Sequence, residues 1–400
     1  MIYARSYDKM KSFNKNTNGF GGLLMKKNAV FLMGLFIFSG NAFADQGSNA
    51  IKNETTELKI SGYIDGSYNN LQQNFFTSNT FDRVFENAQN GFTLQQAAIT
   101  FAYQPTQGFG GLVNPIMGYD TNIFAPYGFK PITEFSSQTF SIDVPQAFLQ
   151  YAKNAFTVIG GRFVELAGYE VLFPTQDSNF SRSILYGYAE PFTVLGIRGT
   201  YVANDKLTLV MGINNGWDNI RDWSRTKTLE LNGTYTPNSF FSFSPTIYTG
   251  QERATPQTDT GPTGWRTLVD LVATFNLNEK LSVIANYDGG WQTNAALPNG
   301  TDNRAVWQGI AAYLNYTFND KWLTSLRGEY FNDQDGFRTG VRQAWKEVTL
   351  SLGYIPIKNT ELRGEVRHDF SNVNSFTNNH GVPVRNNAQS YSLEAFYKFG

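Results

Sequence analysis

The chain contains no cysteine and only two histidines, His368 and His380. Without cysteine, disulfides and zinc–thiolate sites are excluded together. Acyl transfer needs an imidazole beside a nucleophile, and no serine motif accompanies either histidine. A dinucleotide fingerprint is excluded as well, because no helical pattern follows Gly108-Phe109-Gly110-Gly111. The sequence therefore predicts no cofactor and no metal site.

Charge is also scarce. Only 16% of the residues are charged, whereas roughly 25% is usual for soluble proteins. The net charge of −1 gives no reason to expect nucleic acid as a partner. Aromatic residues make up another 16% of the chain, yet the mean hydropathy is negative. This combination favours a fold with one face toward lipid and one toward water, which a closed transmembrane β-barrel provides.

Long hydrophobic runs are missing. The apolar run from Ala29 to Phe38 is about half of the ~20 residues that a membrane-spanning helix needs. It follows Lys26 and Lys27 and precedes the small-residue pattern Ala42-Phe43-Ala44, as in a signal peptide cut after Ala44. We therefore expect a misassigned start or disordered leader at 1–24, a signal peptide at 25–44, a short periplasmic segment at 45–56 and an outer-membrane barrel at 57–400.

Instead of long apolar runs, the mature part shows short runs in which apolar and polar residues alternate. Runs of about ten such residues, separated by turn residues, are typical of barrel strands. Sixteen runs can be counted. They lie at 57–70, 92–104, 108–120, 142–152, 155–163, 192–203, 206–214, 227–236, 239–249, 265–276, 280–291, 305–318, 321–332, 346–355, 359–370 and 389–399.

The connectors between these runs alternate strictly between short and long. The short ones are tight-turn sequences such as Pro105-Thr106-Gln107 and Asn204-Asp205. The long ones, among them 164–191 and 371–388, are rich in polar residues and glycine. An up-and-down barrel with short periplasmic turns and long extracellular loops has this order. The sequence thus predicts an all-β, antiparallel barrel of about 16 strands.

The two faces of each expected strand differ in polarity. In 359–370, Leu362 and Val366 share one face, while Glu361, Arg363, Glu365 and Arg367 share the other. A lipid-facing Lys or Arg costs ~2–4 kcal/mol at the bilayer midplane, so we expect the charges to point inward. The same parity predicts these pore-lining residues: Asp65, Arg198, Glu230, Asp270, Asp288, Arg327, Glu329, Glu347, Glu361, Arg363, Glu365, Arg367 and Glu394. In 155–163 both faces are apolar, and parity assigns neither to the lumen.

Part of the chain resembles a known family. The segments Gly160-Gly161-Arg162-Phe163, Asn179-Phe180-Ser181-Arg182-Ser183, Tyr186-Gly187-Tyr188-Ala189-Glu190-Pro191-Phe192-Thr193 and Asn215-Gly216-Trp217-Asp218-Asn219 resemble the OmpL-like β-barrel porin family. The resemblance is dense between about 155 and 240. It implies a channel in the bacterial outer membrane and leaves the solute open.

The longest connector, 164–191, follows the fifth strand, where general porins carry a loop that narrows the lumen. It contains Glu165, Glu170, Asp177, Arg182 and Glu190. One hypothesis is that its acids face Arg198, Arg327, Arg363 and Arg367 across an aqueous gap, so that a transverse field filters solutes. The alternative is an extracellular loop that closes the barrel mouth. Because acids and bases on the wall are nearly balanced, no charge selectivity is predicted.

Function follows from these expectations. The sequence predicts passive diffusion of small hydrophilic solutes or ions through a water-filled barrel, with no chemistry. A lipase-like barrel enzyme and a structural or adhesin-type surface barrel are the alternatives. The expected partners are outer-membrane lipid and lipopolysaccharide, the barrel-assembly machinery, small polar solutes and a homotrimer of the chain itself.

Overall fold

In the computed structural model, the described residues are 57–71, 83–86, 91–126, 141–222, 224–253, 263–377 and 382–400. The expected leader, signal peptide and periplasmic segment lie outside them and stay predictions, as does any role of His380.

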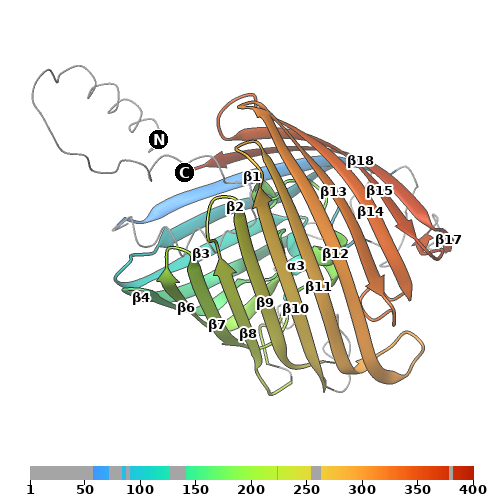
Figure 1. The fold of residues 1–400 in the computed structure, drawn as a ribbon, viewed down its shortest axis with the longest axis horizontal. Coiled ribbons are helices and arrows are strands. Elements are labelled where there is room, and N and C mark those ends of the chain that lie inside the picture. Colours follow the sequence, from blue (N-terminus) through green and yellow to red (C-terminus); the bar gives the residue numbers. More distant parts are fainter. Residues whose placement is uncertain are drawn as a thin grey trace, which may run out of the picture. The chain divides into compact units, whose positions relative to one another are not determined.

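Within these residues, sixteen long antiparallel strands close into one barrel (Figure 1). Each strand pairs with its neighbours in the chain, and β1 closes the barrel on β18, with Gly62 opposite Phe399. The strands are β1 Lys59–Leu71, β2 Gly91–Tyr103, β3 Gly108–Gly118, β4 Ser141–Lys153, β5 Phe156–Val164, β6 Thr193–Asn204, β7 Leu207–Asn214, β8 Thr228–Tyr235, β9 Phe241–Arg253, β10 Thr263–Asn276, β11 Leu281–Ala296, β12 Asp302–Asn319, β13 Trp322–Asp333, β14 Gln343–Tyr354, β15 Thr360–Ser371 and β18 Asn387–Phe399.

The predicted fold class is confirmed, and each of the sixteen predicted runs corresponds to one strand. Two differences concern the long connectors. The strands β11 and β12 extend beyond the predicted 280–291 and 305–318 and form a tall hairpin. In addition, β16 Phe376–Thr377 pairs with β17 Pro383–Arg385 inside the connector that was expected to be strandless. The sequence does not alternate in polarity within these two connectors, so alternation gave no signal for the extra pairs.

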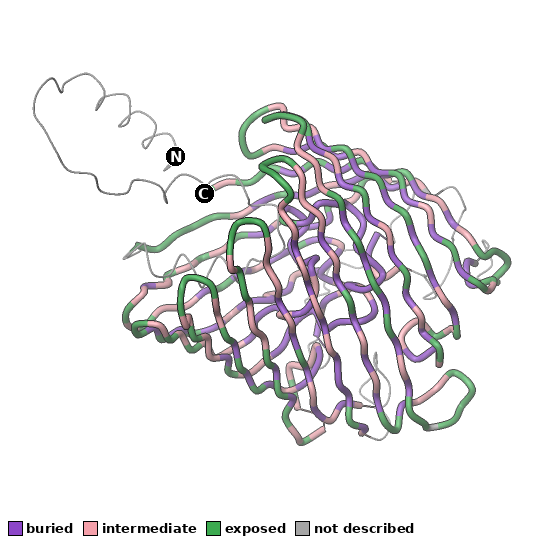
Figure 2. Tube along the Cα trace, viewed as in Figure 1, coloured by how far each residue is buried: buried purple, intermediate pink, exposed green. Residues whose placement is uncertain are grey.

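The predicted parity of the strands is confirmed by burial (Figure 2). On β14, Leu350 is 53% exposed and the next residue, Thr349, is 0% exposed. On β15, Leu362 is 44% exposed and Arg363 is 2% exposed. Apolar side chains thus cover the outside of the barrel and charged ones point inside. This order is the reverse of a soluble protein's, and it suits a barrel surrounded by lipid.

The burial pattern of β5 shows why the sequence did not reveal which of its side chains point inward. Phe156 and Val158 are exposed, but Arg162, Phe163 and Val164 are all buried. Between them lies Gly161, whose φ of 145° is accessible almost only to glycine. A Cβ at this position would come within 2.2 Å of the Ala147 carbonyl oxygen. The alternation of β5 is interrupted at this glycine, so apolar residues fall on both faces and parity assigns neither to the lumen.

Aromatic residues form cross-strand pairs at the short-turn end of the barrel. Ring centroids lie 4.5 Å apart for Phe156 and Tyr201 and 4.6 Å apart for Trp322 and Tyr354. Tyr201 and Trp322 are exposed on the outer surface. Amphipathic rings at this level are the belt expected where a barrel meets the membrane–water interface.

The helices are short: α3 Thr121–Phe124, the 3-10 turn η1 Pro174–Gln176 and α4 Ile184–Tyr188. No helix among the described residues is long and apolar enough to cross a membrane. The apolar core lies inside the barrel, between the connector that holds α4 and the wall. Its aromatic members include Tyr188, Trp307, Phe331 and Trp345.

Candidate functional site

The connector 164–191, hereafter the inner loop, is the most buried connector among the described residues. Of its residues only Gln176 is exposed, and three others are partly exposed. It runs from the end of β5 through η1 and α4 to the start of β6. Its contacts are with side chains that point into the barrel, as described next, so the loop lies within the lumen. An external loop surrounded by water would not show this burial.

Six consecutive peptide N–H groups of the inner loop donate to four glutamate carboxylates. Phe180 and Ser181 donate to Glu365 of β15, at 2.8 and 3.0 Å. Arg182 donates to Glu86 at 2.9 Å, and Ser183 donates to Glu170 of the loop itself at 2.6 Å. Ile184 and Leu185, which begin α4, donate to Glu329 of β13 at 2.7 and 3.3 Å. Hydrogen bonds to charged acceptors are the stronger kind, so these carboxylates fix the loop backbone.

Arginines of the wall bind carbonyl groups of the same segment. Arg327 of β13 donates to the Ser181 carbonyl oxygen at 2.6 Å. On β15, Arg367 donates to the Arg182 carbonyl oxygen at 2.6 Å, and Arg363 donates to the Asp177 carbonyl oxygen at 2.9 Å. The loop backbone is therefore held by acids at its N–H groups and by bases at its carbonyl groups.

The loop acids named from the sequence lie in direct contact with their partners. Glu170 is paired with Arg327 at 2.6 Å, and Asp177 is paired with Arg182 of the loop at 3.0 Å. The hypothesis placed Glu170 and Arg327 on opposite sides of an aqueous gap, and this geometry corrects it. Two charges at hydrogen-bond distance neutralise each other locally, so this pair makes no field across open water. Burial raises the pKa of Asp177 to about 8 despite the adjacent Arg182.

The thirteen wall residues predicted to line the pore all point inward, and all are buried: Asp65, Arg198, Glu230, Asp270, Asp288, Arg327, Glu329, Glu347, Glu361, Arg363, Glu365, Arg367 and Glu394. Several form ion pairs across strands, such as Arg198 with Glu230 at 2.7 Å and Arg363 with Glu394 at 2.7 Å. We expected these side chains to be exposed to water in the lumen. The structure corrects this expectation, because the inner loop and the paired side chains cover them. Whether they line the solute's path stays a prediction.

A second set of inward positions is partly exposed. These residues are polar but uncharged. They point inward, as the buried charged residues do, but lie closer to the short turns. On β8, for example, Glu230 is buried while Asn232 and Thr234 of the same face are partly exposed. The set comprises Thr200, Thr208, Asn232, Thr234, Ser242, Ser282, Asn315 and Thr317. Water therefore reaches the polar lumen from the short-turn side, up to the level of the inner loop.

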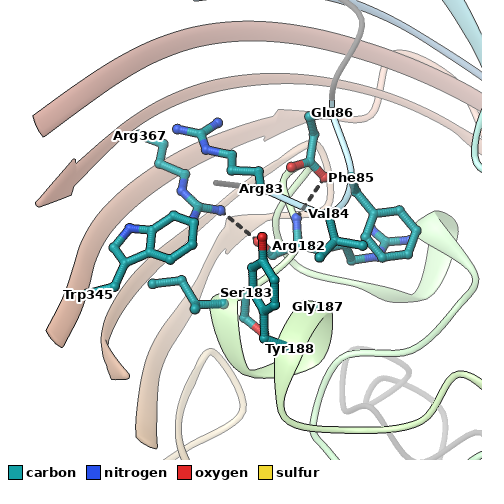
Figure 3. A pocket seen from close by; sticks show the side chains of 11 residues that line it. Arg83, Val84, Phe85, Glu86, Arg182, Ser183, Gly187, Tyr188, Trp345 and Arg367 are labelled. Carbon is teal, nitrogen blue, oxygen red and sulfur yellow. Dashed lines mark hydrogen bonds between the residues drawn. The ribbon is translucent and has the colours of Figure 1, made fainter. Parts of the chain in front are cut away.

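The segment 83–86 also contacts the inner loop and the barrel wall, which the sequence did not predict. Arg83 forms an ion pair with Asp369 of β15, and Glu86 binds the inner loop. Figure 3 shows both with Arg182, Tyr188 and Arg367 around a cavity of about 10 Å³, room for about one water molecule. Burial raises the pKa of Glu86 to about 7, although three arginines lie nearby. The only signal in the sequence was an apolar–charged stretch inside an otherwise polar connector.

A buried ion pair beside β5 was missed for a different reason. Arg162 of β5 is bound by Asp143 of β4 through both carboxylate oxygens, at 2.7 and 2.9 Å. The same guanidinium donates to the Thr193 hydroxyl at 3.1 Å. Arg162 stands in one of the segments that carry the family resemblance, but the broken alternation at Gly161 concealed its inward direction.

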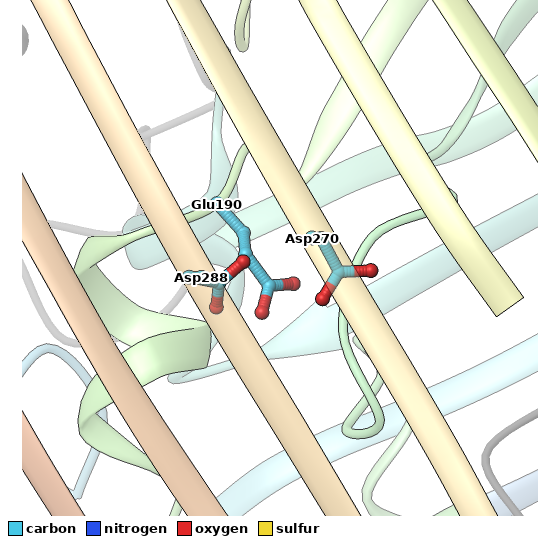
Figure 4. A group of neighbouring side chains, drawn as sticks. All are labelled: Glu190, Asp270 and Asp288. Atoms are coloured by element: carbon cyan, nitrogen blue, oxygen red, sulfur yellow. The ribbon is translucent and has the colours of Figure 1, made fainter. Parts of the chain in front are cut away.

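Three acids meet at the end of the inner loop. Carboxylate oxygens of Glu190, of Asp270 on β10 and of Asp288 on β11 all lie within 4.8 Å of one another (Figure 4). All three side chains are buried. Burial, followed by the charges of the two aspartates, raises the pKa of Glu190 well above its usual range.

Comparison with solved structures finds outer-membrane channels of the same fold. The outer-membrane channel DcaP of Acinetobacter baumannii matches with a TM-score of 0.55 and 14% identity, over 86% of this chain and 97% of that one. An anion-selective porin from Comamonas acidovorans matches with a TM-score of 0.60 and 10% identity, over 86% and 99%. OmpT of Vibrio cholerae, in its trimer form, matches with a TM-score of 0.55 and 10% identity, over 86% and 99%. At these identities the likeness shows the fold.

No curated protein matches the chain in sequence. A family model does match, and it covers residues 57–399, nearly the whole barrel. Its description is "Putative beta-barrel porin-2, OmpL-like". The resemblance stated from the sequence is confirmed. The chain belongs to this family of OmpL-like β-barrel porins, and it is a porin of the bacterial outer membrane.

Proposed function

We propose that this porin lets small hydrophilic solutes and ions diffuse passively, and that the inner loop sets the narrowest level of the path. The main support is that the lumen has an open part on the short-turn side and a part that the inner loop fills. Polar side chains such as Asn232 and Thr234 are accessible on the short-turn side, while the inner loop covers the wall above them. Flow between the two sides is then limited by the space that the loop leaves.

We further propose that the pore discriminates weakly between cations and anions. The wall arginines that face the loop are compensated by acids, as in Arg327 with Glu347 at 2.8 Å and Arg367 with Asp369 at 2.7 Å. A compensated pair contributes little net potential beyond a Debye length, ~8 Å at physiological salt. Selectivity for one sign needs a surplus of charge facing the path.

Planar bilayer recordings of the purified protein test both statements. We expect discrete conductance steps and, in a gradient of KCl, a reversal potential near zero. Swelling of protein-containing liposomes in sugars of increasing size measures the limit set by the inner loop. Purified, folded protein that gives no conductance steps and no swelling would overturn the porin proposal. A reversal potential close to that of an ideally selective membrane would overturn weak selectivity alone.

We propose that the barrel performs no chemistry. A lipase-like site would need a serine beside His368, and the contact that this imidazole makes is with the Phe370 ring, 4.2 Å between centroids. His368→Ala should leave conductance and lipid composition unchanged. Hydrolysis of phospholipid by the purified protein, lost in the H368A variant, would favour the enzyme instead.

The homotrimer also stays a proposal. Its support is the fold shared with OmpT of Vibrio cholerae in its trimer form. Light scattering of the protein in detergent, corrected for bound detergent, should give three times the mass of one chain. A mass of one chain at all concentrations would contradict it.

A further inference from the structure

Among the described residues, the buried acids of the barrel interior mostly have a compensating partner. Glu230 has Arg198, Glu347 has Arg327, and Asp143 has Arg162. Glu329 and Glu365 accept hydrogen bonds from pairs of peptide N–H groups instead. This is the normal condition of a buried carboxylate, because an uncompensated buried charge is costly.

The cluster of Glu190, Asp270 and Asp288 lacks such compensation. Asp270 and Asp288 lie directly opposite each other in the register of β10 and β11, and both point inward. Like charges directly opposite on paired strands destabilise the pair. Glu190 of the inner loop adds a third carboxylate to them (Figure 4). The strongest charges acting on Glu190 are those of other acids.

The hydrogen bonding of the cluster gives an independent indication. Five of its carboxylate oxygens are buried and have no hydrogen-bond partner: both oxygens of Glu190, both of Asp288 and Oδ1 of Asp270. The exposed fractions of these residues are 2% for Glu190 and 0% for the two aspartates. The sixth oxygen, Oδ2 of Asp270, accepts from the Asn286 amide at 2.6 Å. Buried polar atoms without partners are rare, and a bound water molecule or ion is a standard reason for them.

The backbone of the inner loop closes around the cluster. Gly168, with φ of 86°, lies so near that a Cβ on it would come within 2.2 Å of a Glu190 carboxylate oxygen. The cluster therefore sits between the wall and the loop, and its oxygens converge on one small space.

We propose that Glu190, Asp270 and Asp288 bind one Ca²⁺ ion, which ties the end of the inner loop to β10 and β11. The candidate ligand atoms are all carboxylate oxygens, and five of the six have no hydrogen-bond partner. Ca²⁺ takes 6–8 oxygen ligands in a flexible arrangement, with water completing the set, whereas Mg²⁺ demands a near-ideal octahedron. Zn²⁺ sites in proteins are built mainly from Cys and His, and neither is present in the cluster.

Isothermal titration of the folded, EDTA-treated protein in detergent with CaCl₂ tests the site. We expect one ion per chain. Glu190→Gln, Asp288→Asn and Asp270→Asn should each weaken binding by at least the roughly 10–100-fold that changes beyond the direct ligands cause. The matched control is Glu279→Gln, an exposed acid in a short turn, which should bind as the unaltered protein does.

Each variant removes a ligand from a different segment, so those that fold, as judged by heat-dependent migration in SDS gels, decide the test. No heat of Ca²⁺ binding by the unaltered protein at millimolar CaCl₂ would overturn the site and leave a proton-sharing cluster. Undiminished binding in the folded variants would overturn it too. Loss of the Ca²⁺ site and loss of the porin function are distinguishable, since conductance can persist without the ion.

Discussion

The Phe180 N–H group donates to the Glu365 carboxylate at 2.8 Å, although the two residues are 185 positions apart. Glu365 also binds Ser181 N–H at 3.0 Å and accepts from the Ser351 hydroxyl at 2.7 Å. One carboxylate of the wall therefore fixes the part of the inner loop that crosses toward β15. This relationship makes the position of the loop dependent on the wall's charge.

Glu365→Gln should loosen the inner loop. The change keeps the size of the side chain but removes its charge and replaces one of the two acceptor oxygens by an NH₂ group. One of the two backbone N–H bonds to this side chain is then lost, which costs on the order of 1–3 kcal/mol. We expect larger and more variable single-channel conductance. Glu361→Gln is the matched control, because Glu361 lies on the same face of β15 and its carboxylate binds Arg363. Equal conductance in both variants would contradict an anchoring role for Glu365.

Glu86 should make the stability of the site depend on pH. Its pKa is raised from 4.5 to about 7, so between these values the folded state holds more protons than the unfolded state. The free energy of unfolding then falls as pH rises through this window, by up to about 3 kcal/mol for this group.

The Glu86→Gln variant should lose that part of the pH dependence. Thermal unfolding at pH 5 and pH 8 measures it, and the drop in midpoint between the two should be smaller in the variant. An equal drop in variant and unaltered protein would show that Glu86 contributes nothing. The exposed Glu279→Gln variant provides the baseline.

A charge placed on the outer face should hinder membrane insertion. Leu350 of β14 is 53% exposed on the lipid side, and Leu350→Arg should cost ~2–4 kcal/mol if it lies near the midplane. The yield of refolding into phospholipid vesicles should fall. Thr234→Arg, which places the same charge on the lumen side, should refold normally. A reversed order of yields would mean that the two faces are misassigned.

The last strand should depend on its terminal aromatic residue. Phe399 lies opposite Gly62 of β1, and its ring is so close that a Cβ on Gly62 would be 2.5 Å from a ring carbon. Deleting Gly400 should be tolerated, whereas deleting Phe399 and Gly400 together should reduce the amount of folded barrel in the outer membrane. Equal amounts for both truncations would argue against this role.

The strands and their two faces could be predicted because the information is local. A residue's parity on β14 or β15 is visible within four or five positions, and lipid on one side enforces it. The inner loop's surroundings could not be predicted in this way. The bond between Phe180 and Glu365 joins distant residues, and neither one's neighbours in sequence indicate the other. The burial of the wall charges was missed for the same reason. Parity predicts whether a side chain points inward, but not which other residues cover it.

Local backbone exceptions account for the remaining misses. Gly161 interrupts the alternation of β5 and concealed Arg162. The segment around Arg83 lies in a long, mostly polar connector that looks like an ordinary surface loop, yet Arg83 binds Asp369 inside the barrel. The family resemblance pointed to the segments around Arg162 and Phe180, but not to the contacts they make.

We propose that solute moves along the polar, inward face of the barrel wall. Because the chain has no cysteine, single cysteines can be placed without background, at Thr234→Cys inside and at Leu231→Cys on the neighbouring outer face. A charged, water-soluble thiol reagent added to the bilayer should lower the single-channel conductance of the T234C variant and leave the L231C variant unchanged. Conductance that is unaffected in T234C, while L231C responds, would contradict the account.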